Sequence, residues 1–116
     1  MNNKHYNKIT GAQGEMIAEK FLKDKGYKIL EKNYKNTIGE IDIIAKDKDI
    51  IVFVEVKYKK DDYFGLPREA VGKNKQFKIR QVASTYVKNK RLFNNQVRFD
   101  VVEVLGDNIT HLEDCF

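Results

Sequence analysis

The stretch that decides the fold is Ile50–Tyr58, with the sequence IIVFVEVKY. It is rich in β-branched and aromatic residues, which favour a strand. Successive side chains of a strand point to opposite faces, which separates Val52, Val54, Val56 and Tyr58 from Ile51, Phe53, Glu55 and Lys57. Because aliphatic residues lie on both faces, the pattern predicts a central strand that is buried on both sides. A glutamate and a lysine on one such face are costly unless they have partners or a chemical role.

A second strand, Ile38–Ala45 (IGEIDIIA), precedes the first and is joined to it by the polar segment Lys46–Asp49. The two runs therefore predict a β-hairpin. If the chain turns over these four residues, position 45 faces position 50 and Asp42 faces Phe53 on the same side of the sheet. A loop one residue longer would turn Asp42 to the other face, so the prediction depends on the register.

In this register the hairpin brings Asp42, Glu55 and Lys57 to one patch, with Glu40 opposite Glu55. Carboxylates crowded together in a medium of low dielectric repel one another unless a cation lies among them. Oxygen ligands without His or Cys suit a hard ion, which predicts Mg²⁺ or Mn²⁺ at Asp42 and Glu55. A lysine beside that ion can orient a water molecule or stabilise a negatively charged transition state.

The remaining segments predict a single α/β domain with a mixed sheet, a central β-hairpin and flanking helices, in the order α-β-β-β-α-β-β. The predicted helices are Thr10–Lys25 and Lys73–Lys90, and the further strands are Tyr27–Tyr34, Gln96–Leu105 and Ile109–Leu112. Residues 1–9 are expected to form a flexible tail before the domain at 10–116.

The first helix carries two glycines, Gly11 and Gly14, on its apolar face, and Gly26 follows it as a stop signal. Glycine inside a helix costs about 1 kcal/mol relative to alanine, so these two predict a close approach of the helix to the sheet. Glu15 lies at the margin of the same face, from which it would overhang the carboxylate patch.

Composition excludes several classes of protein. A single cysteine among 116 residues excludes an internal disulfide framework and a multi-cysteine zinc site. No apolar run approaches the roughly 20 residues that span a bilayer, and the start of the chain lacks the apolar core of a secretory signal. We therefore expect a cytoplasmic protein with no membrane contact.

The net charge of +5 is concentrated in residues 57–91, which hold 11 basic and 3 acidic side chains. Such a surface is typical of nucleic-acid binding, although a basic helix face is often merely solvated. The residues that we expect to contact phosphates are Lys59, Lys60, Arg68, Lys73, Lys75, Gln76, Lys78 and Arg80.

Asp42 followed by Glu55-Val56-Lys57, with a glutamate on a preceding helix, resembles the PD-(D/E)XK nuclease arrangement. The strings that extend this resemblance are GAQGEMIAEKFLKDKGYKILEKNY, GEIDIIA, IVFVEVKYK, GLPREAV, KQ and RFDVVEV. Together they resemble the bacterial YraN-like family, also called UPF0102, over about residues 10–116. The proline that nominally precedes the motif aspartate is absent, and Ile41 takes its place.

The resemblance implies a restriction-endonuclease-like fold with Asp42 and Glu55 as metal ligands and Lys57 as the catalytic lysine. It also matches Glu15 to the helix-borne glutamate of Holliday-junction-resolvase-like proteins and Lys75-Gln76 to a phosphate contact. Glu40 receives no definite role. The function that we expect is Mg²⁺-dependent or Mn²⁺-dependent hydrolysis of nucleic acid, with DNA as the expected substrate and with a homodimer required to cut a duplex or a branched substrate. The alternatives are a non-catalytic nucleic-acid-binding module of nuclease ancestry and, disfavoured by the charge asymmetry, a protein-interaction adaptor.

Overall fold

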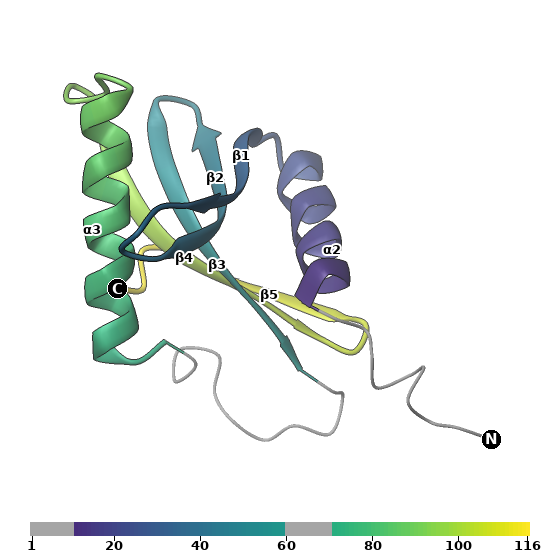
Figure 1. Cartoon of the computed structure of the whole chain (residues 1–116). Helices are drawn as coiled ribbons and strands as arrows, with labels where there is room; N and C mark the ends of the chain where they lie inside the picture. The colour runs from purple at the N-terminus through teal and green to yellow at the C-terminus, as the bar shows by residue number, and fades with distance from the viewer. Residues whose placement is uncertain (1–10, 60–70) are drawn as a thin grey trace.

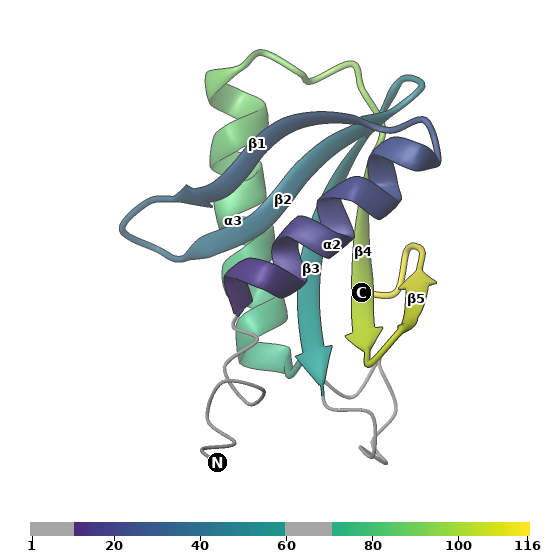
Figure 2. The same ribbon diagram turned by 90° about the vertical axis from the view of Figure 1, so that its right-hand side faces the viewer.

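The computed structural model describes residues 11–59 and 71–116 and contains one five-stranded sheet with a helix on each face (Figures 1 and 2). The element order is the predicted α-β-β-β-α-β-β, which confirms the mixed α/β fold. The elements are α2 (Gly11–Asp24), β1 (Lys28–Lys35), β2 (Glu40–Asp47), β3 (Ile50–Lys59), α3 (Lys73–Asn89), β4 (Val97–Leu105) and β5 (Asn108–Leu112). Neither helix of the described ranges is long and apolar enough to cross a membrane.

Strand β3 lies in the middle of the sheet, between β2 on one side and β4 on the other. It pairs antiparallel with β2 and parallel with β4, and α3 forms part of the crossover that a parallel pair requires. Ile51 and Phe53 pack in the core beneath α3, whereas Val52 and Val54 pack in the core beneath α2. The prediction of a central strand buried on both faces is therefore confirmed.

The predicted register of the hairpin is wrong by two residues. Strand β2 continues through Asp47, so the turn contains only Lys48 and Asp49, and Lys48 has a positive φ of 56°. Ala45 consequently pairs with Val52 instead of Ile50. The expected four-residue turn rested on the polarity of positions 46 and 47, but a partly exposed strand end accepts polar side chains. A shift of two residues preserves the faces of the strands, because side chains alternate with a period of two.

Helix α2 lies close to the sheet at Gly14. A Cβ atom placed on Gly14 would lie 2.9 Å from the Cβ of Tyr58 on β3, so only a residue without a side chain fits there. This confirms the predicted close approach at Gly14. The helix ends at Asp24, and Gly26 follows with a φ of 96°, in the left-handed region that glycine adopts most readily. Thr10, the first residue of the predicted helix, lies outside the described residues.

A buried ion network joins β4 to β5 away from the hairpin carboxylates. Asp100 is fully buried, and its carboxylate accepts hydrogen bonds from Arg98 at 3.0 Å and from the backbone N–H of Asp114 at 2.9 Å. His111 Nε2 on β5 lies 2.7 Å from the same carboxylate. Burial alone would raise the pKa of Asp100, but the hydrogen bonds from His111, Arg98 and Asp114 hold it below its usual value.

We expect Gly14→Ala to destabilise the protein. Alanine gains about 1 kcal/mol in helix propensity, but its methyl group overlaps the stem of Tyr58, and relieving that overlap moves α2 away from β3. The expected net loss in the free energy of unfolding is about 1–2 kcal/mol, measured by urea denaturation.

The matched control is Gly72→Ala at the N-cap of α3, where an added Cβ meets nothing within 4 Å and φ is −73°. That variant is expected to unfold within about 0.5 kcal/mol of the wild type. A Gly14→Ala protein as stable as the wild type would contradict the close contact.

Candidate functional site

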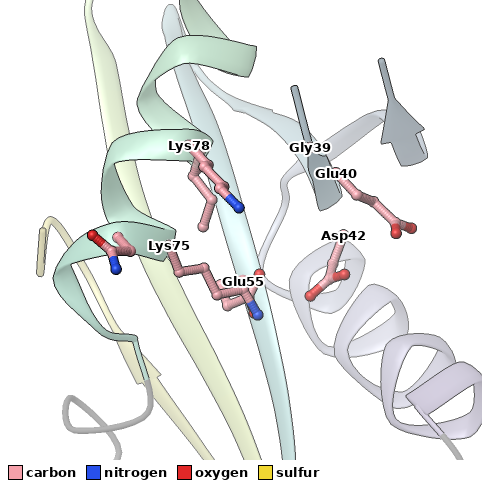
Figure 3. Close-up of a pocket in the computed structure, with 8 residues that line it drawn as sticks. Gly39, Glu40, Asp42, Glu55, Lys75 and Lys78 are labelled. Carbon is pink, nitrogen blue, oxygen red and sulfur yellow. The ribbon is translucent and has the colours of Figure 1, made fainter. Parts of the chain in front are cut away.

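A pocket of about 460 Å³ opens where β2, β3 and the first turns of α3 meet (Figure 3). Its lining residues come from all three elements and from the residue before β2: Gly39, Glu40, Asp42, Glu55, Asn74, Lys75, Lys78 and Ile79. The pocket thus combines the acidic residues of the hairpin with the basic residues at the start of α3.

Glu55 and Asp42 are the two neighbouring carboxylates of the pocket. Glu55 lies on the central strand and is only 4% exposed. Asp42 lies on β2, directly before Ile43. Ile43 pairs with Val54 of β3, and this pair is the one furthest from the turn of the hairpin. The Oδ2 of Asp42 accepts a hydrogen bond of 2.8 Å from the backbone N–H of Val56, and its carboxyl group is within hydrogen-bonding reach of Glu55. The sequence-based prediction that these two carboxylates converge is met, although in a different register.

The crowding of these carboxylates changes the protonation of Asp42. Burial, and after it the neighbouring charge of Glu55, raise the pKa of Asp42 to about 8. The hydrogen bond from Val56 acts in the opposite direction, and the charge of Glu15 adds to the increase. At neutral pH Asp42 therefore keeps its proton.

Two lysines contact the same oxygen of Glu55. The Nζ of Lys75 forms a close ion pair with Oε2, and the Nζ of Lys57 lies 3.7 Å from the same atom. Burial on its own would lower the pKa of Lys75, but the hydrogen bond and charge of Glu55, together with the charge of Asp42, raise it. Both ammonium groups thus compensate the buried carboxylate.

Glu15 and Glu40 are joined to each other by Asn33, a residue that the sequence analysis missed. The Nδ2 of Asn33 donates hydrogen bonds to Glu15 at 2.7 Å and to Glu40 at 3.3 Å. Asn33 has a positive φ of 50°, which a non-glycine residue in a strand rarely adopts and which asparagine tolerates best. Glu40 points away from Glu55 (Figure 3), so the predicted placement of Glu40 opposite Glu55 is wrong.

The predicted phosphate contacts on α3 separate into three groups. Lys73 and Lys78 are exposed, and Lys78 lines the pocket beside Lys75. Gln76 donates its side-chain amide to the carbonyl of Val71 at 2.9 Å, so it supports the start of the helix. Arg80 lies on the other flank of α3, where its guanidinium covers the ring of Phe99 at 4.7 Å. Lys60, Arg68 and the side chain of Lys59 lie outside the described part of the structure.

The donor set suits a hard divalent cation. Within residues 11–59 and 71–116 no three His, Cys, Asp or Glu side chains are grouped closely enough to hold one ion together. Asp42 and Glu55 therefore provide two carboxylates, without Glu15 as a third direct ligand. Two carboxylates suffice for Mg²⁺, which usually retains several waters and takes further oxygens from a phosphate substrate. The negative charge of Glu55 helps to keep a proton on Asp42, and a divalent cation bound between the two carboxylates would offset that charge.

We expect Asp42 to make stability depend on pH. The folded protein keeps the proton of Asp42 up to about pH 8, whereas the unfolded chain loses it near pH 4. The folded state binds the additional proton, so its free energy of unfolding falls as the pH rises through that range. Relative to Asp42→Asn, the metal-free wild type is expected to lose roughly 1–3 kcal/mol between about pH 5 and pH 8 in urea denaturation.

The control for this experiment is Asp49→Asn, which changes an exposed carboxylate in the turn of the same hairpin. This variant is expected to keep the pH dependence of the wild type. Parallel stability curves for the wild type and Asp42→Asn would show that the Asp42 carboxyl group titrates normally.

Comparison with known proteins identifies the chain's family. Residues 14–104 match the family model described as "Uncharacterised protein family UPF0102". A UPF0102 protein of Syntrophus aciditrophicus is 48% identical over 111 residues, which cover 92% of this chain and 87% of the relative. A UPF0102 protein of Caldanaerobacter subterraneus is 53% identical over 97 residues, which cover 84% of this chain and 80% of the relative. The chain belongs to the UPF0102 family.

Proposed function

We propose that the protein is a metal-dependent nuclease that hydrolyses phosphodiester bonds in nucleic acid, with DNA as the expected substrate. The observation that carries this proposal is the pair of adjacent carboxylates, half-buried Asp42 and buried Glu55, in a pocket that Lys75 and Lys78 also line. A pocket with this charge distribution suits a cation at the base and a phosphate at the mouth.

Mg²⁺ or Mn²⁺ bound by Asp42 and Glu55 would offset their charge and the negative charge that develops on the phosphate oxygens during hydrolysis. Lys57, whose ammonium lies 3.7 Å from Glu55, would orient the attacking water and stabilise the same developing charge. Lys73 and Lys78 are exposed on α3 and would bind the phosphates on either side of the scissile bond. Glu15, held by Asn33, would act through a water molecule.

The alternative is a nucleic-acid-binding module without catalytic activity. The ion pair between Lys75 and Glu55 favours it, since this contact compensates the buried carboxylate without a metal. In that case the pocket would bind phosphate through its lysines, and the acidic residues would serve to hold those lysines in place.

An assay on labelled oligonucleotides separates these functions. Purified protein with Mg²⁺ or Mn²⁺ is incubated with single-stranded, duplex, flapped and four-way-junction DNA and with matching RNA, and the products are resolved on denaturing gels. We expect cleavage of at least one DNA substrate and a loss of about 100-fold or more in rate for Glu55→Gln and Lys57→Ala.

The matched controls are Glu113→Gln and Lys88→Ala, which change exposed residues outside the pocket and are expected to cleave at the rate of the wild type. Equal cleavage by the wild type and Glu55→Gln would identify a contaminating nuclease. If no substrate is cleaved while DNA affinity falls with rising salt concentration, the non-catalytic module is the correct function.

A further inference from the structure

Lys75 is the cation that now lies against the buried carboxylate. Its side chain extends from the first turn of α3 to Glu55 (Figure 3), and the two groups form a close ion pair. A metal ion that binds through Oε2 of Glu55 must share or displace this ammonium, because both Lys75 and Lys57 approach that oxygen. Lys75 therefore competes directly with a metal ion at this position.

The two lysines differ in how readily they can leave Glu55. Lys57 belongs to the central strand and its side chain is 23% exposed, so the sheet limits where its ammonium can move. Lys75 belongs to the first turn of a helix and its side chain is 46% exposed. A half-exposed lysine with a four-carbon stem can rotate toward the solvent at little energetic cost.

The surroundings of Lys75 indicate where it would go once released. Asn74 and Lys78 line the pocket beside it, and the first turn of α3 contains no acidic residue that would hold the ammonium elsewhere. The N-terminal end of a helix also favours anions. A phosphate at the mouth of the pocket is thus the ligand that this charge distribution suits best.

We propose that Lys75 is a metal-gated phosphate contact: Glu55 holds its ammonium in the metal-free protein, and metal binding at Asp42 and Glu55 releases it to the nucleic acid. This proposal rests on the proposed function, since it requires the metal site. It predicts that metal and nucleic acid bind cooperatively, because the metal makes one further ammonium available to the phosphates.

The first test is calorimetric titration of Mn²⁺ into the wild type, Lys75→Gln and Lys78→Gln. Removal of the competing ammonium is expected to tighten Mn²⁺ binding by about 10-fold in Lys75→Gln. Lys78→Gln is the matched control, since it removes a neighbouring lysine that forms no ion pair with Glu55 among those observed between described residues, and its change is expected to stay within about twofold.

The second test measures the affinity of each protein for one fluorescent DNA oligonucleotide by anisotropy, with and without Ca²⁺, and checks on a gel that the DNA remains intact. Lys75→Gln is expected to weaken binding by about 5-fold or more with Ca²⁺ and by less than about twofold without it. Lys78→Gln is expected to weaken binding equally in both conditions. Glu55→Gln removes the ion pair that holds Lys75. In that background, Lys75→Gln is expected to weaken DNA binding even without metal.

The outcomes distinguish this proposal from the proposed function. Equal Mn²⁺ affinities in the wild type and Lys75→Gln, or an effect on DNA affinity that does not depend on metal, would overturn the role of Lys75 and leave the nuclease proposal intact. If neither the wild type nor Lys75→Gln binds Mn²⁺, the metal site is refuted and both proposals fail.

Discussion

The burial of Glu55 is the constraint on which the site depends. A carboxylate that is 4% exposed on the central strand is tolerated only with cationic partners or hydrogen-bond donors around it. Three nearby groups meet that requirement: Lys57 follows on the same strand, Lys75 reaches across from α3, and Asp42 keeps a proton. The site is therefore a set of charges arranged around one inaccessible group, and a change in any member alters the protonation or the position of the others.

The sequence predicted the central strand well because that strand depends on a strong local pattern. Aliphatic residues lie on both faces of β3, and only a central position in the sheet buries both faces. The face on which Glu55 and Lys57 lie could therefore be predicted directly from the alternation. The turn before β3 was less well determined. Lys46 and Asp47 are polar and resemble turn residues, yet they lie in the ladder at the partly exposed end of β2. Local polarity does not distinguish a turn from such a strand end.

Two side-chain contacts between distant segments were not predicted from the sequence. Lys75 was expected to face a phosphate and instead contacts Glu55, because the rotation of α3 about its axis is set by its packing on the sheet. Asn33 connects Glu15 on α2 with Glu40 on β2, and only the folded arrangement brings those three residues together. The left-handed backbone at Asn33 is the one feature that leaves a signal in the sequence, since asparagine is preferred there.

The separation along the sequence between the two carboxylates and Lys75 has a consequence for the kinetics of folding. Asp42 and Glu55 belong to one tight hairpin, whereas Lys75 arrives only with the crossover that pairs β3 with β4. Local hairpins close sooner than long-range parallel pairs, so we expect the two carboxylates to meet before this compensating ammonium is in place. The repulsion between the two carboxylates then raises the free energy of the transition state for folding. Folding should accordingly be fastest in mildly acidic solution, where a proton screens the pair while the crossover is still forming.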